Sequence, residues 1–132
     1  MAATIPESYK DLFNKVAFAN LATLMPDGSP QVTPVWLNYD GSNIWVNSAK
    51  GRVKDKNMRR NKKVALSIQD PDNAYRHLSL QGDVVEITEQ GADDHIDMLA
   101  KKYLGKDKYP FRAPGEVRVI YKIRPVKVTT TG

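Results

Sequence analysis

The chain has 132 residues, of which 41% are hydrophobic and 27% are charged, a balance typical of one folded domain and unlike that of a disordered segment. It has no cysteine and no apolar run close to the roughly 20 residues that span a bilayer, which argues against a disulfide scaffold and a transmembrane helix. The formal net charge of +5 directs attention to anionic ligands, nucleic acid among them.

The first half of the sequence predicts a short helix followed by three strands. Pro6 opens a segment in which apolar residues recur at helical spacing from Tyr9 to Val16. Alternating or small apolar residues then predict strands, separated by turns that contain Gly28 and Gly41. These strands are expected over residues 18–25, 31–39 and 43–48. The short turns between them indicate antiparallel pairing through hairpins.

The second half predicts two further helices and three more strands. A loop over 49–52 leads into a helix over 53–61, and residues 92–104 form the most regular helix, with Gly105 at its C-terminal cap. Gly82 interrupts the longest strand and predicts a β-bulge or a close approach by another group. The strands are expected over residues 64–70, 75–88 and 117–128. Six short strands with few helices indicate a mainly β fold, a β-barrel or a sandwich.

The sequence offers few side chains for acid–base or nucleophilic catalysis. Its two histidines are His77 and His95, and we expect His95 to be a structural residue on the exposed face of the 92–104 helix. Without cysteine or a cluster of histidine and carboxylate, no metal site is expected. No glycine-rich nucleotide motif or serine nucleophile motif is present. If the protein is an enzyme, a bound cofactor is therefore expected to supply the chemistry.

The positive charge is concentrated in one basic stretch, residues 50–63. It holds eight of the 20 basic residues and one of the 15 acidic residues, Asp55. The cations could form a solvated helix face, or a strip that tracks nucleic-acid phosphates while Trp36, Trp45 and Tyr39 stack on bases. The third interpretation, which we favour, is a compact phosphate pocket.

The phosphate-pocket interpretation depends on groups that meet where a strand ends and a helix begins. The hydroxyl of Ser48 can donate at the strand end, and Lys50, Arg52 and Lys54 crowd the following loop. The free N–H groups at the helix start near Val53 point to the same place. A phosphate monoester or diester is the ligand that such a set of donors favours.

Segments spread over most of the chain carry a family resemblance when their order and spacing are taken together. They are the apolar run and turn at 20–30, the strand at 43–48, Lys54, Asn57–Asn61, the strand at 64–68 and Arg76–Val84. In this order they resemble the pyridoxamine 5′-phosphate oxidase-like superfamily, and more narrowly its B-type flavin/deazaflavin oxidoreductases. The resemblance extends from about Leu12 to Val128.

The resemblance implies a split β-barrel of the type that binds flavin mononucleotide (FMN), with residues 1–132 as a single domain. It implies a homodimer with two equivalent cofactor sites at the interface. The cofactor ring would lie along the second and third strands, and its phosphate beside the basic loop. The residues that it assigns to the cofactor are Thr33, Pro34, Val35, Trp36, Val46, Asn47, Ser48, Lys50, Arg52, Val53, Lys54, Lys56 and Asn57, with Arg76 and His77 contributed across the interface.

The same resemblance implies an oxidoreductase that uses coenzyme F420 or FMN. We expect F420, because the cations beyond Lys54 suit its acidic tail and because the FMN-using oxidases tend to carry glutamine where this chain has His77. The expected reaction is hydride transfer to or from a small conjugated organic substrate, with Arg76 and His77 as candidate catalytic residues. The segment after Val128 is too short to recognise pyridoxal phosphate as the true oxidases do, so vitamin B6 synthesis is not expected.

Two alternatives of another class remain open: a cofactor-binding protein without turnover, and a small nucleic-acid-binding barrel. We expect neither a nucleic-acid partner nor a membrane partner. The first residues lack the basic and apolar segments of a signal peptide, and cysteine is absent, so the expected location is the cytoplasm.

Overall fold

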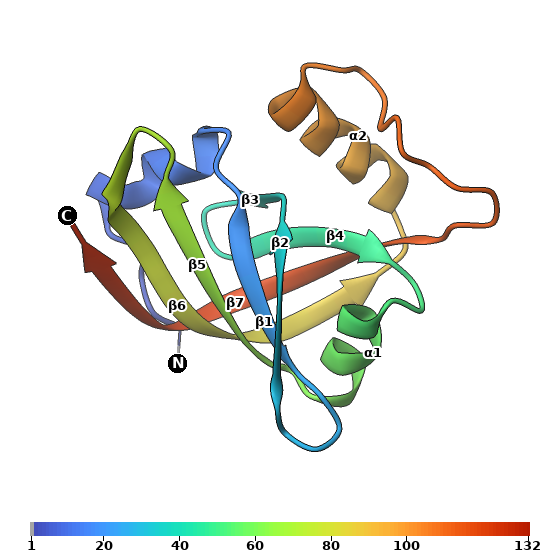
Figure 1. Ribbon diagram of the computed structural model, residues 1–132, viewed down its shortest axis with the longest axis horizontal. Helices are drawn as coiled ribbons and strands as arrows, with labels where there is room; N and C mark the ends of the chain where they lie inside the picture. Colours follow the sequence, from blue (N-terminus) through green and yellow to red (C-terminus); the bar gives the residue numbers. More distant parts are fainter. Residues whose placement is uncertain (1) are drawn as a thin grey trace.

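Seven antiparallel strands form one curled sheet in the computed structural model, which describes residues 2–132 (Figure 1). The strands are β1 (Ala19–Leu24), β2 (Pro30–Val35), β3 (Leu37–Tyr39), β4 (Ile44–Ala49), β5 (Lys63–Asp70), β6 (Asn73–Thr88) and β7 (Arg118–Thr131). Their order across the sheet is β2-β1-β5-β6-β7-β4-β3, with the two longest strands side by side in the middle. The mainly β class is confirmed, and the sheet has the form of a half-barrel.

One strand predicted as continuous, residues 31–39, is divided at Trp36 into β2 and β3. Strand β2 pairs with β1, whereas β3 pairs with β4, so the two pieces lie at opposite edges of the sheet order. The chain therefore turns the corner between the two edges at Trp36. Apolar alternation could not reveal this corner, because side chains alternate in both pieces.

Three helices flank the sheet: the 3-10 helix η1 (Glu7–Asn14), and the α-helices α1 (Val53–Arg60) and α2 (Ala92–Leu104). Helix α2 has the predicted bounds, buries Ile96 and Leu99, and ends at Gly105, whose φ is 71°. In the view of Figure 1, α2 lies above β4 and α1 lies below the end of that strand. Within residues 2–132, no helix has the length and apolar character needed to cross a membrane.

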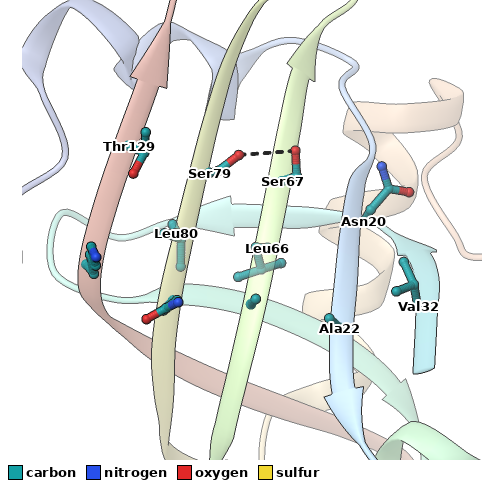
Figure 2. Close-up of a pocket in the computed structure, with 11 residues that line it drawn as sticks. Asn20, Ala22, Val32, Leu66, Ser67, Ser79, Leu80 and Thr129 are labelled. Carbon is teal, nitrogen blue, oxygen red and sulfur yellow. Dashed lines mark hydrogen bonds between the residues drawn. The ribbon is translucent and has the colours of Figure 1, made fainter. Parts of the chain in front are cut away.

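The two faces of the sheet differ because side chains alternate along each strand. In β5 the inward Leu66 and Ile68 are buried in the core, whereas the outward Ala65 and Ser67 are partly exposed. Figure 2 shows small side chains on this outer face, with the hydroxyls of Ser67 and Ser79 3.4 Å apart. The outer face is hollowed across β2, β1, β5, β6 and β7, and it is lined mainly by small and polar residues.

At Gly82 the structure has both features that the sequence offered as alternatives, a β-bulge and a close approach by another group. The pairing of β6 with β7 shifts register between Gln81 and Gly82, as a β-bulge requires. A Cβ at Gly82 would lie 2.7 Å from Cγ2 of Ile123 and 2.9 Å from the carbonyl oxygen of Arg124. A side chain at this position would therefore force the two central strands apart.

Candidate functional site

One pocket, about 150 Å³ in volume, opens between the β2–β3 corner, β4, the start of α1, α2 and the segment before β7. Six of its lining residues are among those predicted from the sequence: Pro34, Val35, Trp36, Asn47, Arg52 and Lys54. Five others are Phe18, Ile96, Tyr109, Phe111 and Arg118. The strand positions that the resemblance assigned to the cofactor and the basic loop that the charge pattern singled out therefore meet in space. We call this the corner pocket.

Aromatic rings form one wall of the corner pocket. Trp36 stacks on Tyr103 with ring centroids 5.2 Å apart and an interplanar angle of 6°, and Tyr109 meets Trp36 edge-on at 5.9 Å. The Tyr103 hydroxyl donates to the carbonyl of Ala17 at 2.7 Å, which holds the stack in place. Burial raises the pKa of Tyr103 to about 12, so the phenol stays protonated near neutral pH. The wall is a fixed aromatic surface against which a planar ring can pack.

Three cations, Arg52, Lys54 and Arg118, form a second wall of the same pocket. Burial lowers the pKa of Lys54, and the charges of Arg52 and Arg118 lower it further. Arg118 pairs with Glu116, but within residues 2–132 neither Arg52 nor Lys54 has a carboxylate within ion-pair distance. Cations held together with too few counter-ions favour the binding of an anion.

A buried polar group lies behind the corner pocket, where α2 packs on β3 and β4. His95 Nδ1 lies 3.0 Å from Asn47 Nδ2, and His95 Nε2 lies 2.7 Å from Asn38 Oδ1. The expectation that His95 is exposed is wrong, since only 4% of its surface is accessible. Its face of α2 packs against the strands and not against water, and a polar partner on each side makes this burial possible. Burial lowers the pKa of His95 to about 4, aided by the charges of Arg118 and Lys122.

His95 should make the protein less stable as the pH falls from about 6.5 to about 4. The imidazole of the unfolded chain takes up a proton below about 6.5, whereas the folded chain resists protonation until about 4. The unfolded state thus binds more protons in this window, and the full loss is about 3 kcal/mol. Urea unfolding between pH 4 and 7 measures the effect. His95→Gln should flatten it, and an unchanged slope in that variant would contradict the assignment.

The comparison with known proteins identifies the family. The family model described as pyridoxamine 5′-phosphate oxidase matches residues 5–132. The chain belongs to this family. A solved structure of an F420 reductase is 33% identical to the chain, with 95% of this chain and 98% of that chain covered and a TM-score of 0.83. No protein with a curated description matches the chain.

Two further solved structures resemble the chain at lower identity. Rv2991, a conserved hypothetical protein from Mycobacterium tuberculosis, is 24% identical, with 98% of this chain and 86% of that chain covered and a TM-score of 0.74. HupZ of Group A Streptococcus is 22% identical, with coverage of 96% and 94% and a TM-score of 0.67. At such identities the likeness concerns the fold alone. The split-barrel fold of the pyridoxamine 5′-phosphate oxidase family, implied by the resemblance, is confirmed.

Several residues that the resemblance assigned to the cofactor do not line the corner pocket. Ser48 is buried with its Oγ unpaired, and Lys50 pairs with Glu89 at 3.2 Å on the surface. Asn57 is buried and donates to Thr23 Oγ1 at 3.0 Å, which ties α1 to β1. Thr33 has a buried hydroxyl without a partner, Val46 is buried in the core, and Val53 and Lys56 are exposed. Of the assigned residues from Lys50 to Asn57, Arg52 and Lys54 are the two that line the corner pocket.

The later cations of the basic stretch serve helix α1 itself. Arg59 pairs with Asp55 at 2.9 Å, and Arg60 donates to the carbonyl of Leu24 at 3.2 Å. Lys62 donates to two carbonyls in the last turn of α1, at 2.8 and 3.1 Å. Beyond the two cations of the corner pocket, the basic stretch keeps only Lys56 and Lys63 without a hydrogen-bond or ion-pair partner for their side chains in the described residues, so the continuous strip of free cations that a nucleic-acid interface requires is interrupted.

Arg76 and His77, the candidate catalytic residues, lie on β6 away from the corner pocket of their own chain. Arg76 pairs with Asp11 at 2.7 Å and with Asp70 at 2.8 Å, which joins η1 to the sheet. These two carboxylates raise the pKa of Arg76 above its usual range, so it holds its proton firmly. His77 has a buried Nδ1 without a hydrogen-bond partner.

The most informative residue that the sequence did not single out is Arg118. It stands in an alternating strand, where a basic residue usually points to solvent, and only 5% of its surface is accessible. Tyr109 and Phe111 come from a polar loop without a periodic pattern. Their one sequence signal is the presence of two aromatic residues in an otherwise charged and proline-containing segment.

Proposed function

We propose that the protein is an oxidoreductase that binds coenzyme F420 in the corner pocket and acts on a small conjugated organic substrate. The observation that carries this proposal is the meeting of an aromatic wall with a cluster of under-neutralised cations in one pocket. A deazaflavin with a phosphate presents the same two features, a planar ring and a negative charge. The 33% identity to a solved F420 reductase over 95% of the chain supports the choice.

The residues of the pocket fit such a cofactor. Arg52, Lys54 and Arg118 would hold its phosphate, and Trp36 and Val35 would lie beside its ring. The cofactor, when bound, supplies reversible hydride transfer. The chain contributes position: Trp36 stacks on Tyr103, and a buried hydrogen bond from the Tyr103 hydroxyl to Ala17 fixes that ring, so the plane of the stack is set before substrate arrives.

FMN is the alternative cofactor, since its ring and phosphate require the same two walls. F420 differs in carrying an acidic tail beyond its phosphate. Lys56, exposed on α1 one turn from Arg52, is a cation without an ion pair in the described chain and is in place to meet that tail. Exposed pairs of this kind contribute about 0.2–1 kcal/mol each, so we expect a preference for F420 rather than exclusion of FMN.

We further propose that the protein works as a homodimer in which the second copy covers the outer face. The corner pocket, at about 150 Å³, is smaller than the roughly 300 Å³ at which ligand pockets usually begin, so it needs a further wall. The outer face reaches this pocket: Asn20 of the outer face pairs in register with Pro34 of the pocket. A copy seated on the outer face would thus complete the site, and His77 is the residue we expect it to bring near the substrate.

Ala65→Arg should yield a monomer that binds the cofactor weakly. Ala65 lies in the middle of the outer face and lines both of its hollows, of about 460 and 430 Å³. A charged side chain there would have to be buried without a partner in the dimer. Light scattering after size-exclusion chromatography measures the mass. Gln90→Arg, an exposed change before α2, is the matched control and should leave the dimer intact. A dimeric Ala65→Arg protein would contradict this interface.

Fluorescence titration of the purified protein with F420 and with FMN tests the proposed function. We expect saturable binding of F420 in the micromolar range and weaker binding of FMN. Oxidation of reduced F420 by a panel of quinones and other conjugated acceptors then tests for turnover. Tight binding without turnover on any acceptor would favour a cofactor-binding protein, and no binding of either cofactor would refute the proposal.

A further inference from the structure

We propose that Arg118 binds the phosphate of the cofactor and that Asn47 is its positioning residue, held in turn by His95. This inference rests on the proposed function. It names the residue that selects for the anionic group, one that neither the sequence pattern nor the family resemblance had assigned.

Three contacts fix the guanidinium of Arg118, and its Nη2 is left without a partner in the described residues. Its Nε donates to Asn47 Oδ1 at 2.9 Å, and its Nη1 donates to Glu116. The guanidinium lies over the ring of Tyr109, with its central carbon 5.0 Å from the ring centroid. Within residues 2–132, Nη2 has no acceptor, and the residue lines the corner pocket. A guanidinium held in this way presents a donor to the pocket without further loss of side-chain freedom.

The orientation of the Asn47 amide follows from its partners. Arg118 Nε can only donate, so the atom of Asn47 that faces it is the oxygen. The carbonyl of Ala92 can only accept, and it lies 3.0 Å from Asn47 Nδ2. The second hydrogen of Nδ2 then points to His95 Nδ1, which must accept it. His95 consequently carries its proton on Nε2 and donates it to Asn38 Oδ1.

Through this chain of hydrogen bonds, His95 on α2 fixes the orientation of Asn47, and Asn47 fixes that of Arg118. Each of these donor hydrogens has one compatible acceptor, so the amide cannot turn over without breaking the bond to Arg118. Arg52, by contrast, is exposed, and nothing in residues 2–132 fixes its guanidinium. Arg118 is therefore the preorganised member of the three cations, whereas Arg52 and Lys54 add charge that adjusts to the ligand.

The test compares F420 with its chromophore lacking the phosphate and tail, for the wild-type protein and for Arg118→Lys and Arg118→Met. Both variants should bind F420 about 10- to 100-fold more weakly, since a charge-assisted hydrogen bond is lost, and should bind the phosphate-free chromophore within about 3-fold of wild type. Thermal unfolding identifies any variant that fails to fold. An equal loss for both ligands, or no loss for either, would overturn the inference. If the wild type binds neither F420 nor FMN, the proposed function falls first, and this assignment with it.

The positioning role has its own readout. His95→Leu should reduce the preference for F420 over the phosphate-free chromophore, because Asn47 loses the partner that orients it. His95→Gln should restore that preference, since the amide oxygen of glutamine can accept from Asn47 in place of Nδ1. Equal preference in both variants would contradict the relay and leave His95 as a packing residue.

Discussion

Lys54→Ala should weaken the binding of F420 about 10- to 100-fold, the largest effect on binding that we expect from any lysine of the basic stretch. Lys54 lies at the start of α1, is partly buried, and lines the corner pocket beside two arginines. Its charge is disfavoured in the free protein, because burial and the charges of its two neighbours lower its pKa. An anion in the pocket relieves this repulsion, so the ligand and the proton on Lys54 bind together.

This coupling gives the prediction a pH signature. As the pH rises through the lowered pKa of Lys54, the ammonium loses its proton and the affinity of the wild type should fall. The affinity of Lys54→Ala should lack that step. Lys106→Ala removes the same charge from an exposed loop after α2 and is the matched control. Fluorescence titration at pH 7 to 10 measures all three proteins, and a wild-type affinity equal to that of Lys54→Ala would rule out this role.

Much of the fold was predictable because the elements have local causes. The bounds of α2 follow from its apolar spacing and from Gly105, and the bulge follows from Gly82. The corner at Trp36 was not predictable in the same way. It depends on which edge each half of the segment pairs with, and pairing is a property of the whole sheet. Local alternation is the same on either side of the corner, so the sequence predicts the strands and not the turn between the edges.

In the candidate site, too, local features were predictable from the sequence and long-range contacts were not. The charge of the sequence identified the basic loop, and the family resemblance added the two strands that bound the corner pocket. The sequence could not tell that Lys50 was already engaged, because its partner Glu89 lies 39 residues away and reaches it only on folding. Nor could it show that Arg118 turns inward, because the partner that holds it, Asn47, lies 71 residues away.

Asp55 is the single acid in the basic stretch, and its hydrogen bonds connect that stretch to the core of the barrel. Only 2% of its surface is accessible. It accepts from the backbone N–H of Gly51 at 2.9 Å, from Arg59 Nε at 2.9 Å, and from the hydroxyl of Tyr121 in the core. Although burial raises its pKa, these donors together hold the pKa of Asp55 below its usual range. The turn that presents Arg52 and Lys54 is therefore anchored by a carboxylate that stays ionised at neutral pH.

Asp55→Ala should lower the free energy of unfolding by about 3 kcal/mol, because the Tyr121 hydroxyl and the Gly51 N–H lose their acceptor inside the protein. The same variant should bind F420 more weakly even where it remains folded, since the turn that carries Arg52 and Lys54 loses its anchor. Urea unfolding and cofactor titration measure the two effects.

Tyr121→Phe separates the two effects of the anchor. It removes one hydrogen bond to Asp55 but leaves the bond from Gly51, so it should cost about 1 kcal/mol of stability and retain cofactor binding. Asp107→Ala, at a side chain that is 87% exposed, should change stability by less than about 0.5 kcal/mol. Cofactor binding that is equally weak in Tyr121→Phe and in Asp55→Ala would show that the core bond, and not the bond to the Gly51 turn, holds the pocket. The ordering we expect follows from geometry, because the Gly51 bond is the one that holds the loop leading through Arg52 into the first turn of α1, where Lys54 lies.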